Sequence, residues 1–451
     1  MEKQGKRQLR VVLVPCPIQG HINPMLQLGT ILYSKGFSIT VAHTNFNSPN
    51  PSNHPNFNFL LVPDVLNEFQ SSSGDMMAVV LRLNDNCKAP FQECLAQLMK
   101  QHKTQDEVIS CIIYDEIMYF AESVANQLKL PSIILRPLSA NFFISRNALL
   151  QFKAGGNLFL TGLGSEEIVP NFHPFRWKDL PVSKFGSLET MSQLFENASH
   201  VGNSAAVIVN TMDFLEQPSL ARILQQCQVP LFSIGLYKFA PAFSSSLLKE
   251  DMSCITWLDK QTKNSAIYVS LGSVTLIDEN ELAEMAWGLA NSEQPFLWVV
   301  RPGSVRGSDW LESLPEGFIE SIGERGCIVK WAPQKEVLAH QSVGGFWSHC
   351  GWNSTMESIS QGVPVICRPN SGDQKVNARY LSHVWKVGLE LENGVERGEV
   401  ERVVRRLMVE KEGMEMRQRA KDLKKKAEHC IGKGGSSYNS LNKLVKFINS
   451  F

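Results

Sequence analysis

The sequence predicts an α/β protein made of two doubly wound halves, each built around a parallel sheet. Three observations support this prediction. At 451 residues the chain is too long for one ordinary hydrophobic core. A strand–helix–strand pattern starts at Arg10, and a second α/β series starts at Ala266. Such units have right-handed crossovers and parallel strands. We therefore expect domains at 1–240 and 241–451, with a cleft between them.

The first half begins with the apolar run RVVLVP at 10–15, which is typical of a buried strand. A loop with Pro17, Gly20 and Pro24 follows, and then a helical pattern that Gly36 closes. The region 136–205 is rich in Phe, Pro, Gly and Ser and predicts short helices and loops. Further strands are expected at 37–43, 108–114, 132–135, 206–210 and 231–234, with a helix at 120–129.

The second half is expected to follow a linker at 238–248, where periodicity is weak and three serines are consecutive. A helix is predicted at 278–291, and charged helices at about 396–431 and 436–450 end the chain. We expect the last helix to pack back on the first half. Strands are expected at 266–271, 296–300, 327–330, 344–348 and 363–367.

Composition excludes several classes of protein. Lys plus Arg and Asp plus Glu both number 44, so the zero net charge argues against nucleic acid or an anionic membrane as the main partner. The ten cysteines form no C-x-x-C pair, which argues against a zinc or thioredoxin-like site. The first apolar run is too short for a secretory signal, and no run approaches the ~20 residues of a membrane span. We expect a cytoplasmic monomer without a metal.

The 44-residue stretch from Trp331 to Gln374 carries the densest set of candidate site residues. Trp331 follows a predicted strand, where its indole could stack on a nucleobase or simply pack in the core. Gln334 offers both a donor and an acceptor to a base edge or a ribose.

His349 ends an apolar strand, and Gly351 provides a tight turn before a predicted helix. A helix N-terminus with small polar side chains can bind an anion, and His349 adds a donor at the same place. Asn353 and Ser354 could instead be capping residues only. Glu357 could accept two hydrogen bonds from a ribose diol, or complete a capping box.

Two further pairs follow strands at their carboxyl ends, where open α/β sheets bind ligands. Asp373 and Gln374 suit sugar hydroxyls, although alone they could be a polar helix start. His21 and Asp115 follow two different strands of the first half. A carboxylate behind an imidazole fixes its tautomer and stabilises the imidazolium, as a general base requires.

These motifs together closely resemble the plant secondary-product signature of the UDP-dependent glycosyltransferases, glycosyltransferase family 1. The WAPQ opening, the HCGWNST centre and the GDQ end all match, as do QGHINP near the start and WVVRPG at 298–303. The chain looks closest to the group that acts on steviol glycosides, cytokinins and small hydroxy acids. The resemblance implies a GT-B fold, with two Rossmann-like domains facing across a cleft.

The resemblance also implies roles for individual residues. Trp331 would stack on uracil, Glu357 would hold the ribose, and Gln374 would favour glucose as the sugar. His21 would be the general base and Asp115 its orienting partner. UDP binding would fall to Ser273, Trp331, Ala332, Gln334, His349, Trp352, Asn353, Ser354 and Glu357. Sugar binding would fall to Trp352, Asp373 and Gln374.

The implied reaction is an inverting transfer from UDP-glucose, as co-substrate, to a hydroxyl or carboxyl group of a small hydrophobic metabolite such as a phenolic, terpenoid or hydroxy acid. The alternatives are an epimerase or hydrolase of the same build, or a UDP-sugar sensor. Because many relatives have Ser or Thr where this chain has Pro137, Ser139 is a candidate substitute. Arg136 could attract an acceptor carboxylate or form a structural ion pair. Acceptor contacts are expected from the loop around 70–90, the region 175–200, and His21, Met118, Tyr119, Phe142 and Phe143.

Overall fold

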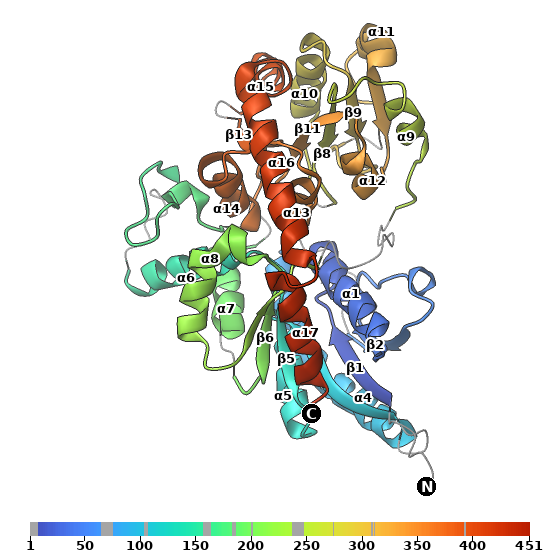
Figure 1. Ribbon diagram of the computed structural model, residues 1–451, viewed down its shortest axis with the longest axis vertical. Coiled ribbons are helices and arrows are strands. Elements are labelled where there is room, and N and C mark those ends of the chain that lie inside the picture. The colour runs from blue at the N-terminus through green and yellow to red at the C-terminus, as the bar shows by residue number, and fades with distance from the viewer. Residues whose placement is uncertain are drawn as a thin grey trace. The chain divides into compact units, whose positions relative to one another are not determined.

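The computed structural model divides the chain into two compact units (Figure 1). The first unit comprises Met1–Gly162, Leu180–Ser245 and Cys430–Phe451, and the second comprises Leu163–Asp179 and Ser246–His429. The structure describes residues 8–64, 75–102, 107–156, 164–182, 186–199, 202–236, 248–273, 275–307, 310, 312–391 and 394–451. Most of the expected linker at 238–248 lies outside these ranges, as do residues 70–74 of the expected acceptor loop.

The first unit is built on a seven-stranded sheet in which every neighbouring pair is parallel, in the order β3-β2-β1-β4-β5-β6-β7. β-branched and aliphatic residues dominate the central strands, and both faces of these strands are buried, as parallel sheets require. The strands are β1 (Gln8–Val14), β2 (Ser38–His43), β3 (Asn58–Leu61), β4 (Glu107–Asp115), β5 (Ser132–Arg136), β6 (Ala206–Val209) and β7 (Leu231–Ser233).

The last helix, α17, belongs to the first unit, although it ends the chain. Leu441, Leu444 and Ile448 recur at helical spacing on one face, and they are buried in the same core cluster as residues of α1. Ser110 Oγ on β4 donates to the Ile448 carbonyl at 2.8 Å. The helices of this unit are α1 (Gln19–Ser34), η1 (Pro51–Asn53), α3 (Met76–Asn86), α4 (Lys88–His102), α5 (Phe120–Gln127), α6 (Ala140–Ala154), α7 (Leu188–Ser199), α8 (Asp213–Gln226) and α17 (Ser436–Ile448).

The second unit is built on a six-stranded parallel sheet in the order β10-β9-β8-β11-β12-β13. Its strands are β8 (Ala266–Ser270), β9 (Phe296–Val299), β10 (Gly326–Val329), β11 (Val343–Ser348), β12 (Val365–Cys367) and β13 (Gly388–Glu390). Its helices are η3 (Trp177–Asp179), α9 (Ser253–Leu258), α10 (Glu279–Asn291), α11 (Phe318–Ile322), η5 (Gly323–Arg325), α12 (Gln334–Ala339), α13 (Trp352–Gln361), α14 (Asp373–Arg379), the π-helix η6 (Tyr380–Val384), α15 (Arg397–Met408) and α16 (Lys411–Ile431).

The structure departs from the predicted elements in several places, three of which concern whole segments. The helix expected at 396–431 is two helices, α15 and α16, and Gly413 lies so near α15 that a Cβ there would be 2.0 Å from the Leu407 carbonyl oxygen. The region 136–205 holds two substantial helices, α6 and α7. Residues 163–179, expected in the first half, group with the second unit, whose residues Glu390 and Arg379 contact them.

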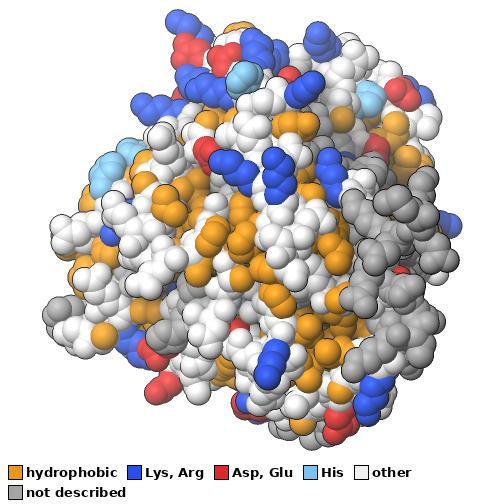
Figure 2. All heavy atoms as spheres, turned by 60° about the horizontal axis from the view of Figure 1, so that its bottom comes forward, with side chains coloured by type: hydrophobic (Ala, Val, Ile, Leu, Met, Phe, Trp, Pro, Cys, Tyr) orange, Lys and Arg blue, Asp and Glu red, His pale blue; other side chains and the backbone are white. Residues whose placement is uncertain are grey.

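Surface charge is mixed. Figure 2 shows basic side chains interspersed with acidic ones along the upper edge of one face, with hydrophobic atoms between polar ones across its middle. None of the helices in the described part of the chain combines the length and apolarity that a bilayer span requires.

Candidate active site

Gln334, Ser354 and Glu357 come together in the second unit at the carboxyl end of its sheet. Gln334 Nε2 donates to Ser354 Oγ at 3.0 Å and to Glu357 Oε2 at 2.6 Å, and Tyr268 Oη donates to Gln334 Oε1 at 3.2 Å. Burial raises the pKa of Glu357, and the Gln334 hydrogen bond opposes that rise. Two helices, α12 and α13, thus present an amide, a hydroxyl and a carboxyl in one polar cluster.

The N-terminus of α13 follows β11 through a tight turn. The N-cap is Gly351, and no side chain caps this end. Asn353 and Ser354 lie in the first turn, so the capping role that the sequence left open for them is wrong. Glu357 forms no capping box either, because its carboxylate accepts from Gln334. The N-terminus of α13 therefore has no side-chain cap of its own, and the Trp352 N–H at its start donates to Asp373 Oδ2 at 3.2 Å.

His349 lies against two glycines that leave room for its ring. A Cβ on Gly272 would come within 2.6 Å of His349 Cε1, and one on Gly351 within 2.5 Å of Nε2. Gly272 has a φ of +79°, which favours glycine. The next residue is Ser273, so the β8 turn and the imidazole are neighbours. Any side chain at either glycine would displace the ring.

The imidazole of His349 is neutral at pH 7. Burial lowers its pKa to about 4, and a hydrogen bond with the Ser270 backbone opposes this shift only in part. Its Nδ1 is buried and has no hydrogen-bond partner within the described ranges. His349 therefore offers a hydrogen-bonding atom rather than a positive charge.

Asp373 and Gln374 brace the site from α14. Asp373 Oδ2 accepts from the backbone N–H of Trp352 at 3.2 Å and from Asn377 Nδ2 at 2.9 Å. Gln374 Oε1 accepts from the backbone N–H of Asn370 at 2.8 Å. The indole of Trp352 is buried in the core, and its backbone N–H is the group that contacts Asp373.

Trp331 and Ala332 lie between β10 and α12. Ala332 is buried, and Trp331 packs beside the core cluster beneath these elements while part of its side chain stays exposed. The Trp331 carbonyl accepts from the backbone N–H of Asp251 at 2.9 Å. This contact fixes the backbone from which the indole projects.

His21 and Asp115 meet in the first unit. His21 Nδ1 lies 2.8 Å from Asp115 Oδ2, and Asp115 is fully buried at the end of β4, whereas the His21 side chain is 11% exposed. The Ile117 backbone N–H donates to Asp115 Oδ1 at 3.2 Å. A carboxylate at Nδ1 favours the tautomer with the proton there, which leaves Nε2 as an acceptor. The helix begins at Gln19 rather than after Pro24, so His21 lies in its first turn and not in a loop.

Comparison with known proteins identifies the family. Residues 244–417 match the family model described as UDP-glucoronosyl and UDP-glucosyl transferase. The chain is 51% identical to the flavonol 3-O-glucosyltransferase UGT76E12 of Arabidopsis thaliana over 99% of its length and 98% of that protein. It is 51% identical to UDP-glycosyltransferase 76E11 of the same plant, over 97% and 98% of the two chains. The chain belongs to the UDP-glycosyltransferase family.

Solved UDP-glycosyltransferases share its GT-B fold. Phytolacca americana UGT2, complexed with UDP-2-fluoro-glucose and pterostilbene, matches with a TM-score of 0.83 and 26% identity over 98% of this chain and 100% of that one. TcCGT1 in complex with UDP matches with a TM-score of 0.80 and 28% identity, over 98% and 99%. As a member of this family, the chain is a glycosyltransferase that transfers a sugar from a UDP-sugar to small plant metabolites.

The residues expected to bind the acceptor are mostly buried in this UDP-glycosyltransferase. Met118, Phe142 and Phe143 are each at most 6% exposed, and the ring of Phe142 packs edge-on against Phe195 at 5.8 Å. Tyr119 is more open, and its Oη accepts from Asn197 Nδ2 at 2.9 Å. Tyr119 is therefore the best placed of the four for a polar contact with a ligand.

Pro137 and Ser139 are both held by hydrogen bonds within the first unit of this UDP-glycosyltransferase. Ser139 is buried, and its Oγ accepts from the backbone N–H of Phe142 at 3.0 Å as the N-cap of α6. Ser139 Oγ is thus used as a helix cap, and its contact with a sugar stays a prediction. The carbonyl of Pro137 accepts from Asn210 Nδ2 at 3.0 Å, which ties this segment to β6.

Arg136 forms a structural ion pair, and the sequence did not reveal its full network. Its Nε lies 3.3 Å from Glu116 Oε2, and Arg146 Nη1 lies 3.2 Å from the same oxygen. Both guanidinium groups also contact the Phe143 ring, at 3.7 and 4.7 Å from its centroid. The spacing of residues in the sequence did not predict that Glu116 and Arg146 belong to this network.

Proposed function

We propose that this UDP-glycosyltransferase transfers glucose from UDP-glucose to a hydroxyl or carboxyl group of a small hydrophobic plant metabolite, with inversion at the anomeric carbon. The hydrogen bond between His21 Nδ1 and the buried Asp115 carboxylate, 2.8 Å long, is the observation that carries the proposal. It leaves a partly exposed imidazole nitrogen able to accept a proton, as a general base must.

In the proposed reaction, Nε2 of His21 takes the proton from an acceptor hydroxyl held within hydrogen-bond distance. The acceptor oxygen forms a bond to the anomeric carbon of glucose as the bond from that carbon to the UDP oxygen breaks. Attack from the face opposite the leaving group converts the α-linked donor into a β-glucoside. Asp115 stabilises the imidazolium that forms.

UDP binding is proposed for the second unit. The positive end of α13 would attract the diphosphate, with Ser273 beside it. His349 would contribute a neutral hydrogen bond and not a charge, because burial lowers its pKa to about 4. Trp331 would stack on uracil, and Glu357 would hold the ribose hydroxyls. Asp373 and Gln374 would reach the sugar from the start of α14.

The relatives favour an aromatic acceptor. One relative is named a flavonol 3-O-glucosyltransferase, and the Phytolacca enzyme was solved with pterostilbene. We therefore expect a phenolic to be the most productive class. UDP-glucose should be incubated with separate phenolics, terpenoids and hydroxy acids, with UDP release and product mass measured. Glucoside masses support the transferase, whereas a new UDP-hexose or free glucose without any glucoside would favour the epimerase or hydrolase.

Glu357→Gln is expected to weaken UDP binding by roughly 10- to 100-fold, the loss of about 1.5–3 kcal/mol for hydrogen bonds to a charged group. The substitution keeps the shape of the side chain but removes the charge that would accept from both ribose hydroxyls. Isothermal titration with UDP measures the effect. The exposed neighbour Glu336→Gln serves as the control and should bind UDP like the parent chain. Equal affinities in all three proteins would remove Glu357 from the UDP site.

A further inference from the structure

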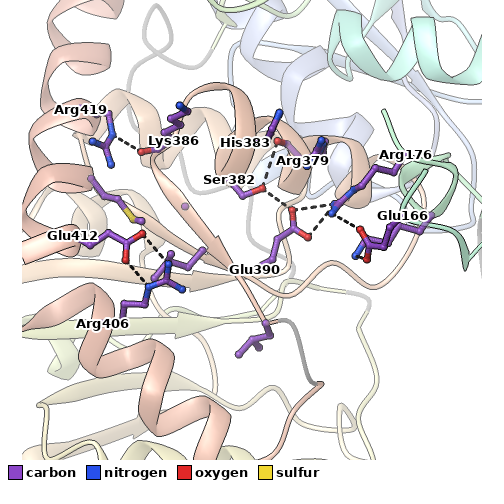
Figure 3. Close-up of a pocket in the computed structure, with 15 residues that line it drawn as sticks. Glu166, Arg176, Arg379, Ser382, His383, Lys386, Glu390, Arg406, Glu412 and Arg419 are labelled. Carbon is purple, nitrogen blue, oxygen red and sulfur yellow. Dashed lines mark hydrogen bonds and ion pairs between the residues drawn. The ribbon is translucent and has the colours of Figure 1, made fainter. Parts of the chain in front are cut away.

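A polar cavity lies in the second unit and shares no residue with the proposed UDP site. Its volume is about 610 Å³, within the range of small-molecule sites. It lies between the segment around Arg176, the π-helix η6, β13, and the helices α15 and α16 (Figure 3). We call it the basic pocket. It is lined by Glu166, Arg176, Lys178, Arg379, Ser382, His383, Lys386, Gly388, Leu389, Glu390, Leu391, Arg406, Glu412, Met416 and Arg419.

The lining carries an excess of positive charge in a chain whose net charge is zero. Six side chains are cationic and three are carboxylates, so the balance is +3 with His383 neutral. Burial lowers the pKa of His383, and the cations Arg379, Arg176 and Lys386 lower it further. Several cations therefore act on this imidazole, and a bound anion would offset part of their charge.

The three carboxylates are already committed to particular partners. Glu166 accepts from Arg176 at 2.9 Å and also pairs with Lys178. Glu390 accepts from Arg176 at 3.1 Å and from Ser382 Oγ at 2.6 Å (Figure 3). These contacts take up the charge of Arg176 and Lys178.

Glu412, the third carboxylate, and Arg419, another cation of the lining, also have partners within the protein. Glu412 accepts both a 2.5 Å and a 2.9 Å hydrogen bond from Arg406. Arg419 Nε donates to the Lys386 carbonyl at 2.6 Å and so satisfies the end of η6 (Figure 3). Beyond the lining, Arg419 lies 3.9 Å from Glu415 and Arg379 Nε lies 3.8 Å from Asp179, so Lys386 is the lining cation without a carboxylate partner among the described residues.

Arg379 and Lys386 supply the unused donors. Arg379 is 9% exposed and donates its Nε to the Pro174 carbonyl at 2.9 Å, while no described residue accepts from its Nη atoms. The Lys386 ammonium forms no ion pair within the part of the chain that the structure describes. A buried guanidinium whose Nη atoms border a cavity is suited to bind a planar or tetrahedral oxyanion.

Lys386 also occupies a backbone position that favours glycine. It follows the end of η6 with a φ of +54°, in the left-handed region where glycine has no Cβ penalty. A lysine there costs conformational energy, and such outliers gather at functional sites. A cation therefore lies at the pocket although glycine would adopt this turn with less conformational strain.

We propose that the basic pocket is a second anion site that binds a diphosphate group through the Nη atoms of Arg379 and the ammonium of Lys386. The diphosphate could be free pyrophosphate or part of a nucleotide, because both present the same oxygens. The inference does not depend on the roles proposed for His21 or Glu357.

The test is a titration of inorganic pyrophosphate into the full chain with UDP saturating the other site. One pyrophosphate should bind, and Lys386→Gly should weaken it by about tenfold or more, since a charge-assisted contact is lost. Lys386→Gly is suited to this test because glycine fits the φ of +54°, so the thermal midpoint should stay equal or rise. The control is Lys425→Ala, which removes one charge from a side chain that is 73% exposed on α16 and should bind pyrophosphate unchanged.

A competition experiment with ADP identifies the source of the diphosphate, and two outcomes would overturn the proposal. ADP that displaces pyrophosphate in the presence of saturating UDP identifies a nucleotide as the ligand, and ADP that fails to displace it identifies free pyrophosphate. Absence of pyrophosphate binding to the parent chain overturns the proposal. Equal affinity in the parent chain, Lys386→Gly and Arg379→Gln also overturns it.

Discussion

Replacement of His21 by alanine is expected to lower kcat for glucose transfer by about 10²–10⁴-fold, the usual contribution of a positioned general base. The acceptor hydroxyl would lose the group that takes its proton, and the buried Asp115 carboxylate would lose its imidazole partner. The affinity for UDP should change by less than about twofold. His21 is not one of the residues proposed to bind UDP, so its removal affects the reaction and not the binding of UDP.

The measurement combines initial rates of glucoside formation with UDP titration of the same preparation. His429→Ala is the matched control, since that imidazole is exposed on α16 and lies in neither proposed site. Asp115→Asn should lower kcat as well, because an amide at this position no longer stabilises the imidazolium. A His21→Ala protein with near-normal kcat would show that another group accepts the proton.

Glu116→Ala is expected to have the largest effect on stability, a loss of about 3–5 kcal/mol in the free energy of unfolding. Glu116 is the shared carboxylate partner of Arg136 and Arg146, which are 2% and 0% exposed. Without it, two guanidinium groups would stay buried with the rings of Phe143 and Phe195 as aromatic faces against their charge. Burial already lowers the pKa of Arg146, which indicates how poorly this position solvates a cation.

Urea denaturation followed by circular dichroism measures this loss. Glu93→Ala removes an exposed carboxylate from the same unit and should remain within about 0.5 kcal/mol of the parent chain. Replacing Arg136 and Arg146 by methionine together with Glu116→Leu should recover much of the loss, because no charge then stays buried. A Glu116→Ala protein as stable as the Glu93→Ala control would contradict the assigned role of the ion pairs.

Much of the fold could be predicted because the buried strands have a recognisable sequence pattern. Runs such as RVVLV in β1 and the apolar stretch of β4 are β-branched and bounded by turns, which is the pattern of a parallel sheet covered on both faces. The strands that went unpredicted, β3 and β13, have only four and three residues and lie at sheet edges. Their pairing depends on a neighbouring strand that is distant in sequence, so local pattern carries little signal.

The candidate site was predictable where function is concentrated in one stretch and less so elsewhere. The sequence named Gln334, Ser354 and Glu357, and the structure brings their side chains within hydrogen-bond distance. It could not show that Trp352 turns its indole into the core, or that Ser139 is consumed as a helix cap. Both outcomes depend on tertiary packing, which a residue's type and spacing do not specify.

Residues that act through distant partners were missed altogether. Glu216 accepts from the backbone N–H groups of Ala140 and Asn141 at 3.0 and 2.8 Å and so satisfies the N-terminus of α6 from 75 residues away. Burial raises the pKa of Glu216 to about 7. The contacts of Arg379 and Lys386 in the basic pocket are equally non-local, which explains why no motif pointed to it.

The anomeric configuration of the glucoside tests the central claim most directly. The parent chain should be given UDP-glucose and a phenolic acceptor, and the purified product examined by proton NMR. A single displacement with His21 as the base predicts a β-glucoside. An α-glucoside would contradict the mechanism, because retention requires a second displacement or attack from the face that the leaving UDP occupies.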